Sequence, residues 1–251
     1  MVTKRAAPLF LFCVAIASCA SPRATAATPG RSAAATVPPI TTTTPPSPTA
    51  VLAAVRYVAI GASDTVGVGA NDPATGSWPA RVAALLPPGG AYVNIGVSGS
   101  VATQARDQQL PAAIAQRPTV VSVWLAVNDM NASVTPAAYR DALVAIVDGL
   151  VTRTDAQVFV GNVPDLRGVP AYKDVDKAQL GAQIQAYNDT IASIVASRAG
   201  RAYLVDLFTG SAPLVSTITV SGDGFHPSDE GYKLIAERFA NAMRAAGVPL
   251  R

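Results

Sequence analysis

The chain has 251 residues, of which half are hydrophobic and only 14% charged, so it can bury a sizeable core in one or two domains. Its formal net charge of +3 arises before residue 54, where four basic residues and no acidic residue occur. Removing these four from the total of 19 leaves 15 basic residues against 16 acidic ones. Nucleic-acid binding needs a basic patch on the folded domain, and this balance indicates none, so we expect no nucleic-acid partner.

The N-terminus has the features of a secretory signal peptide. Lys4 and Arg5 precede an apolar run over residues 6–17, which is shorter than the roughly 20 apolar residues of a membrane span. The run ends in Ile16-Ala17-Ser18-Cys19, which resembles a bacterial lipobox. The resemblance implies that residues 1–18 are removed and that Cys19 is lipidated. The protein would then be anchored at the outer face of the cytoplasmic membrane; ordinary signal cleavage and secretion is the alternative.

Residues 19–53 consist almost entirely of Ala, Thr, Pro and Ser. Prolines favour extended chain, and large apolar side chains are nearly absent, so we predict a disordered linker. A folded domain is expected over residues 54–251. The only other cysteine, Cys13, lies within the signal run, so this domain contains no cysteine. Disulfides, thiolate zinc sites and cysteine nucleophiles are therefore excluded there.

Short aliphatic runs alternate with helical periodicity throughout the expected domain. Strands are predicted at residues 56–60, 92–95, 120–127, 157–160 and 203–207. Helices are predicted at residues 78–86, at about 101–115, from the N-cap Thr135 to about 150, from about 180 to 200, and from the N-cap Ser228 to 247. Continuous Val and Ile runs are typical of parallel strands covered on both faces. The pattern predicts a three-layer α/β/α sandwich with a mainly parallel five-stranded sheet.

Polar residues follow each of these strands. Ligands of such sheets bind outside the carboxyl ends of the strands, so we expect these residues to share one edge. In strand order they are Ser63, residues 96–100, Asn128 with Asp129, Asn162, and Asp223 with His226.

The only histidine of the chain, His226, is the one imidazole that could transfer protons near neutral pH. Asp223 lies three residues earlier and can reach the imidazole across a tight turn. Ser63 follows the first strand at a sharp turn, and a serine hydroxyl becomes a nucleophile when such a base takes its proton. Taken singly, these residues could be a helix cap, a structural histidine and a water-facing carboxylate; their occurrence at one sheet edge favours catalysis.

Acyl transfer also needs donors for the oxyanion that forms on the attacked carbonyl. The backbone N–H groups of Ser63 and Gly99 and the side-chain amide of Asn128 are the candidates at this edge. The alternative for Asn128 and Asp129 is an ordinary turn that closes a strand, with Asp129 facing water.

The domain resembles the SGNH hydrolases, also called GDSL esterases and lipases, over roughly residues 55–247. Four blocks occur in the family's order: Gly61-Ala62-Ser63, residues 94–99, Val127-Asn128-Asp129, and residues 223–227. The resemblance implies a flavodoxin-like fold with Ser63 as nucleophile, His226 as base and Asp223 orienting it. Ser63, Gly99 and Asn128 would form the oxyanion hole. We expect no cofactor, and one histidine without domain cysteines provides no metal-ligand cluster.

Two positions depart from the family pattern. Ala62 replaces the usual aspartate before the serine, while Asp64 follows it, and Ala126 replaces the usual glycine of the asparagine block. Loss of the carboxylate at residue 62 would loosen Ser63 unless Asp64 offsets it. The methyl group of Ala126 is expected at the floor of the acyl pocket, where it would restrict the substrate.

We therefore expect a membrane-tethered, extracytoplasmic serine ester hydrolase that acts through an acyl-enzyme. Its substrate would be a short-chain, lipid or acetylated-sugar ester. The alternatives are an O-acyltransferase to an envelope sugar, which uses the same residues with another acceptor, and a non-catalytic envelope-binding protein that kept the cleft. The sequence leaves the acyl chain, the alcohol and the oligomeric state open.

Overall fold

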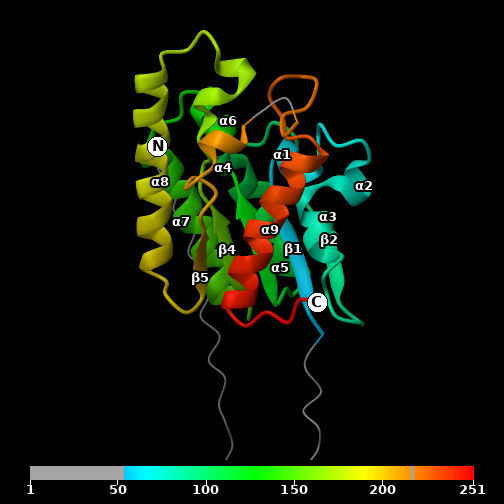
Figure 1. Cartoon of the computed structure of the whole chain (residues 1–251). Coiled ribbons are helices and arrows are strands. Elements are labelled where there is room, and N and C mark those ends of the chain that lie inside the picture. The colour runs from blue at the N-terminus through cyan, green and yellow to red at the C-terminus, as the bar shows by residue number, and fades with distance from the viewer. Residues whose placement is uncertain (1–53, 216–217) are drawn as a thin grey trace, which may run out of the picture. The chain divides into compact units, whose positions relative to one another are not determined.

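The computed structural model describes residues 54–215 and 218–251. This part of the chain contains a parallel sheet with strand order β2-β1-β3-β4-β5 (Figure 1). The strands are β1 Arg56–Gly61, β2 Ala91–Asn94, β3 Val120–Trp124, β4 Gln157–Gly161 and β5 Ala202–Val205. Val58 of β1 lies opposite Val93 on one side and Val121 on the other. The predicted α/β fold with a five-stranded parallel sheet is confirmed.

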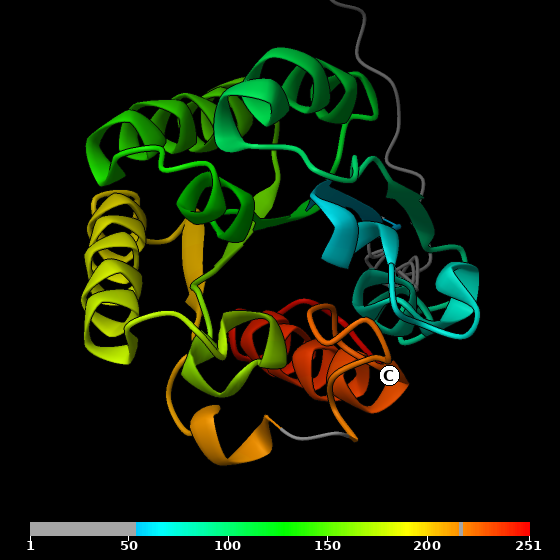
Figure 2. The same ribbon diagram turned by 90° about the horizontal axis from the view of Figure 1, so that it is seen from above.

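Helices connect the strands and cover both faces of the sheet (Figure 2). Helices α3 and α9 lie on one face, where Trp78 stacks on Phe239 with ring centroids 4.1 Å apart. Helices α5, α7 and α8 lie on the other face, where the second and larger part of the core is buried. The α-helices are α1 Ser63–Val66, α2 Pro73–Gly76, α3 Trp78–Ala83, α4 Ala102–Gln104, α5 Leu110–Ala115, α6 Val127–Asn131, α7 Pro136–Arg153, α8 Lys177–Ala196 and α9 Asp229–Ala245. Four short turns of other helix types are η1 Ala105–Gln109, η2 Leu166–Gly168, η3 Pro170–Tyr172 and η4 Ala212–Leu214.

The two predicted helix caps are confirmed. The Thr135 hydroxyl accepts a hydrogen bond from the Ala138 N–H at 3.2 Å and begins α7. The Ser228 hydroxyl accepts one from the Gly231 N–H at 3.3 Å and begins α9, which directly follows the turn that contains His226. A cap fixes where its helix starts, so the second cap also fixes where this turn ends.

The third strand ends earlier than predicted. We expected it to continue to Val127, but β3 ends at Trp124 and Val127 is the first residue of α6. Ala126 between them has φ of +90°, a backbone conformation that ends a strand and that residues other than glycine rarely adopt. Leu125, Ala126 and Val127 continue the apolar pattern of the strand, so their composition conceals the bend.

The predicted helix over residues 101–115 consists of three segments. Its middle part, η1, is a π-helix in which the Leu110 N–H donates to the carbonyl of Ala105. Pro111 follows directly and has no N–H to donate, which favours a local change of helical pitch. The wider turn brings the Gln109 side chain to Gly61, the last residue of β1.

The signal peptide, Cys19 and the linker lie outside the described residues, so these assignments and the domain start at residue 54 remain predictions. Across residues 54–215 and 218–251, every helix is too short or too polar to cross a membrane.

Candidate active site

Three side chains from two distant segments meet at the carboxyl edge of the sheet. Ser63 begins α1 directly after β1, whereas Asp223 and His226 lie on the turn before α9. The imidazole Nε2 of His226 lies 3.0 Å from the Ser63 Oγ, and its Nδ1 lies 2.6 Å from Asp223 Oδ2. The structure thus places the predicted nucleophile, base and orienting carboxylate in one hydrogen-bonded chain.

Asp223 is held by four hydrogen bonds that the sequence spacing only partly suggests. Besides the imidazole, its carboxylate accepts from the N–H groups of Phe225 at 2.8 Å and His226 at 3.0 Å and from the Ser221 hydroxyl at 2.7 Å. Partial burial acts to raise the pKa of Asp223, but these hydrogen bonds outweigh it and hold the pKa well below its usual range. The carboxylate therefore stays ionised while it orients His226.

The three predicted oxyanion donors lie beside this chain of residues. Within the described part of the protein, the N–H groups of Ser63 and Gly99 make no backbone hydrogen bond. Gly99 has φ of +78°, and a methyl group added to it would meet no atom within 4 Å, so the space beside it is open. The Asn128 amide donates one of its two N–H groups to the Ser100 carbonyl at 3.1 Å, which fixes its orientation and leaves the other for a ligand.

Gln109 is a supporting residue that sequence reasoning missed. Its side-chain oxygen accepts from the Gly61 N–H at 3.0 Å, and its nitrogen donates to the Gly61 carbonyl at 3.0 Å and to the Ser100 hydroxyl at 3.1 Å. Gln109 thereby connects the end of β1 to the loop that contains Gly99. No signal in the sequence separates it from the neighbouring Gln108, because only the π-helical turn buries Gln109, which is 2% exposed.

Two other polar residues predicted at this edge support the backbone. Asp129 is 1% exposed and accepts the Ala102 N–H at 3.0 and 3.1 Å, so a water-facing position is wrong. Asn162 accepts the N–H groups of Leu207 at 2.6 Å and Phe208 at 3.1 Å and thus joins the end of β4 to the loop after β5. Neither side chain reaches the triad.

Two cavities are lined by residues next to the triad in the chain, and their linings share three residues. The larger has a volume of about 120 Å³. It is lined mainly by apolar side chains, including that of Phe225, and also by Asp64. These two residues directly neighbour Ser63 and His226 in the chain. The smaller, of about 10 Å³, is lined by Ala62, Asn128 and others, and it shares Asp64, Trp124 and Val127 with the larger one.

The two departures from the family pattern have separate consequences. Ala62 and Asp64 line the same small cavity, together with Asn128. Ala126 is 1% exposed, belongs to the core on the α7 face, and lines neither cavity. The prediction that its methyl group forms the floor of the acyl pocket is therefore wrong; the substitution instead places a non-glycine residue at positive φ.

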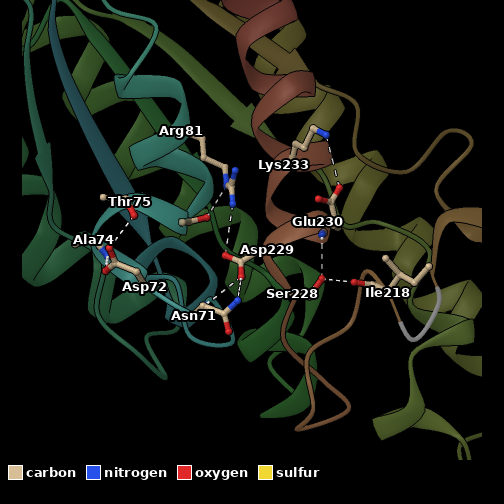
Figure 3. Close-up of polar contacts among 12 residues, drawn as sticks. Asn71, Asp72, Ala74, Thr75, Arg81, Ile218, Ser228, Asp229, Glu230 and Lys233 are labelled. Atoms are coloured by element: carbon tan, nitrogen blue, oxygen red, sulfur yellow. Dashed lines mark hydrogen bonds and ion pairs between the residues drawn. The ribbon is translucent and has the colours of Figure 1, made fainter.

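Asp229, the first residue of α9, ties the loop after Ser63 to the turn of His226 (Figure 3). Its Oδ2 accepts from the Asn71 side chain at 2.5 Å and from the Asn71 N–H at 3.3 Å. Its Oδ1 lies 3.4 Å from a guanidinium nitrogen of Arg81. The hydroxyl of Tyr232, one turn further along α9, donates to the Val68 carbonyl at 2.5 Å. These contacts join the two segments that supply the nucleophile and the base.

Comparison with known proteins agrees with this geometry. The model of the GDSL-like lipase/acylhydrolase family matches residues 59–234, whereas no protein of curated function matches the chain. The crystal structure of TesA is 20% identical, with a TM-score of 0.60 over 76% of this chain and 99% of that chain. The family 3 carbohydrate esterase of Clostridium thermocellum is 21% identical, with a TM-score of 0.59 over 76% and 96%. An Axe2 mutant, an acetyl-xylooligosaccharide esterase from Geobacillus stearmophilus, is 20% identical, with a TM-score of 0.61 over 77% and 94%.

The structural likenesses establish the shared fold, and the family match extends over most of the folded domain, from within β1 into α9. The chain belongs to the GDSL-like lipase/acylhydrolase family.

Proposed function

We propose that the protein is an extracytoplasmic serine hydrolase that cleaves carboxylic esters through an acyl-enzyme. The observation that supports this most directly is the pair of distances at His226, which is 3.0 Å from the Ser63 hydroxyl and 2.6 Å from Asp223. A nucleophile within hydrogen-bond reach of a base that is itself oriented by a carboxylate is the arrangement that acyl transfer needs.

In the first half of the reaction, Ser63 Oγ attacks the ester carbonyl while the Nε2 of His226 takes the hydroxyl proton. Asp223, kept ionised by its hydrogen bonds, stabilises the imidazolium that forms. Negative charge develops on the carbonyl oxygen, where the N–H groups of Ser63 and Gly99 and the Asn128 amide can donate. His226 then gives its proton to the leaving alcohol, and the acyl group remains on Ser63.

In the second half, water takes the place of the alcohol. His226 removes a proton from this water, which attacks the acyl carbonyl, and the same donors stabilise the second oxyanion. The bond to Ser63 breaks, the proton returns to its hydroxyl, and the acid leaves. All proton transfers pass through one imidazole, in agreement with the single histidine of the chain.

The adjoining cavity supports an ester whose acyl part is largely apolar. About 120 Å³ is somewhat less than the roughly 150 Å³ of a dry engineered cavity that binds benzene, so an acyl group of about six carbons is the largest that we expect to fit. The esterases of similar fold act on carbohydrate and acetyl-xylooligosaccharide esters, and a sugar as the alcohol part is compatible with an exposed Gly99 loop.

The test uses the full-length chain in detergent with a fluorophosphonate probe and p-nitrophenyl esters. We expect labelling and turnover to disappear in Ser63→Ala and to persist in Ser193→Ala, which removes an exposed serine of α8. Well-folded wild type that is neither labelled nor active would refute the proposal. Asn128→Ala should reduce kcat by about 10²–10³ if its amide serves the oxyanion, and full activity would remove that role.

The extracytoplasmic location rests on the lipobox-like sequence that ends at Cys19. Metabolic labelling with a fatty acid in a bacterial host tests it directly. We expect the label in the wild-type chain and in Cys13→Ser, because residue 13 lies in the removed segment, but not in Cys19→Ser. Equal labelling of both variants would contradict lipidation of Cys19.

A further inference from the structure

Two carboxyl groups, those of Asp64 and Asp165, lie in the otherwise mainly apolar wall of the larger cavity. Asp64 is half-buried there, among side chains from the loop after β4, the loop after β5 and helix α9. The apolar part of the wall includes Val127, Pro164, Leu166 and Ile235. Placing a carboxyl group against hydrocarbon costs free energy unless a hydrogen-bond donor contacts it, so the position of Asp64 in this wall needs an explanation.

The cavity is lined by the chain neighbours of the nucleophile and the base, Asp64 beside Ser63 and Phe225 beside His226. The oxyanion donors Ser63 and Asn128 would hold that carbonyl, and the small cavity beside Asn128 shares Asp64 with the large one. The acyl chain is the substituent of the carbonyl that stays on Ser63 after the alcohol leaves. A mainly apolar cavity lined by Phe225 and Pro227, on either side of His226, suits this part of the substrate, since the alcohol must be free to depart.

The hydrogen-bond donors near Asp64 have other partners. The hydroxyl of Tyr232 donates to the Val68 carbonyl at 2.5 Å, and that of Tyr172 donates to Asn131 at 2.9 Å. Arg238, which also lines the cavity, donates to the carbonyl of Asp206 at 2.7 Å. The backbone N–H of Asp64 donates to its own carboxyl group, and within residues 54–215 and 218–251 no other residue is seen to donate to it.

Burial brings the pKa of Asp64 closer to neutral pH than that of an exposed carboxyl group. Burial raises the pKa of Asp64 to about 6, with the charge of His226 opposing the rise and that of Asp223 adding to it. The other carboxylate in the cavity wall, Asp165, is paired with Arg167 at 2.6 Å, which lowers the pKa of Asp165. Among the described residues, Asp64 is thus the cavity carboxylate that forms no salt bridge, and it remains available to a ligand.

We propose that Asp64 determines acyl specificity, selecting esters whose acyl chain carries a hydroxyl group that donates a hydrogen bond to its carboxylate. The inference rests on the proposed esterase function. A plain alkyl chain would displace water from the carboxylate without donating a hydrogen bond, whereas a hydroxyl group donates one in place of that water. A hydroxyl fits better than an ammonium, because it loses less hydration on entering an apolar cavity that Arg238 also lines.

The test compares ethyl hexanoate with ethyl 6-hydroxyhexanoate, which have the same six-carbon acyl chain and differ by one hydroxyl group, using the full-length protein. We expect wild type at pH 8 to prefer the hydroxy ester by about tenfold or more in kcat/KM, the range of one hydrogen bond to a charged acceptor. Using the ratio of two esters cancels any general loss of activity and any titration of His226.

Two variants separate the role of the acceptor from that of the charge. Asp64→Leu removes the acceptor and should reduce the preference to about one or below. Asp64→Asn keeps an acceptor without a titrating charge, so its preference should not change with pH. In wild type the preference should fall as the pH drops below about 6, because the carboxyl group becomes protonated.

The outcomes distinguish this inference from the proposed function. Turnover of both esters with a wild-type ratio at or below one, or the same ratio in Asp64→Leu as in wild type, would overturn the specificity role alone. A preference for ethyl 6-aminohexanoate over the hydroxy ester would overturn the choice of a hydroxyl. No turnover of any ester and no fluorophosphonate labelling of Ser63 would overturn the esterase function and this inference with it.

Discussion

Removing the side chain of Gln109 should destabilise the domain and disable the site together. Gln109→Ala deletes three buried hydrogen bonds, two to Gly61 and one to the Ser100 hydroxyl. The Gly61 carbonyl keeps a second donor, the Val97 N–H at 3.1 Å, but the Gly61 N–H loses its acceptor. Each bond contributes about 1 kcal/mol net, and an unsatisfied buried donor costs about 1–3 kcal/mol, so we expect the free energy of unfolding to fall by about 3 kcal/mol.

That loss corresponds to a decrease in Tm of about 6–12 °C for a domain of this size. Thermal and urea unfolding of the purified variant measure it, and ester turnover at a temperature where the variant is folded measures the effect on the site. Gln108→Ala is the matched control, because it truncates the same side chain in the same turn at an exposed position. If the two variants unfold at the same temperature, Gln109 does not support the active site in the way described.

Three further predictions concern backbone space, the link to α9 and acid stability. Gly61→Ala should lower Tm strongly, because its new Cβ would lie 2.0 Å from the Thr65 hydroxyl and 2.8 Å from the Trp124 carbonyl. Gly222→Ala is the control and should leave Tm unchanged, because a Cβ there would meet no atom within 4 Å. Equal melting curves for the two variants would refute the clash. Asp229→Ala should reduce the free energy of unfolding by about 1–2 kcal/mol, because it loses the contacts to Asn71 and Arg81. Glu230→Ala loses only an exposed ion pair with Lys233 at 3.7 Å and should cost less than about 0.5 kcal/mol. Urea unfolding of both variants measures this, and a larger loss in Glu230→Ala would contradict it. Burial acts to raise the pKa of Asp206, but hydrogen bonds from Thr209, Asn162 and Phe208 outweigh it and lower the pKa to about 2. The contribution of Asp206 to stability is therefore present above about pH 4 and is lost as the pH falls towards 2. The decline in Tm between pH 5 and 2 should be smaller in Asp206→Asn than in wild type, and an equal decline would contradict this.

The parts of the fold that depend on local sequence were predictable. Strands β1 and β4 lie within one residue of their expected limits, because buried parallel strands are continuous aliphatic runs. The caps Thr135 and Ser228 were found because a hydroxyl that meets a free N–H is a local interaction. Positions at the ends of consecutive strands then predicted which side chains share an edge, since this follows from topology alone.

The parts that depend on packing between distant segments could not be predicted. The end of β3 is set by the positive φ of Ala126, a residue whose composition suits the strand. The burial of Gln109 depends on a π-helical turn, and the surroundings of Asp64 are provided by loops that follow β4 and β5 about 100 or more positions later. The sequence predicted which side chains meet at the sheet edge, whereas the residues that support them were seen only in the folded structure.

The distance along the chain between nucleophile and base has a consequence for biosynthesis. Ser63 and His226 are 163 positions apart, and His226 immediately precedes the last helix. A nascent chain that has emerged as far as β5 already contains the serine and the oxyanion donors, but it has no imidazole at all. Esterase activity would therefore appear only when synthesis of the domain is almost complete and α9 docks on the sheet. A chain that is truncated or translocated only as far as β5 would have no esterase activity, so measured activity would come from molecules that include His226 and α9.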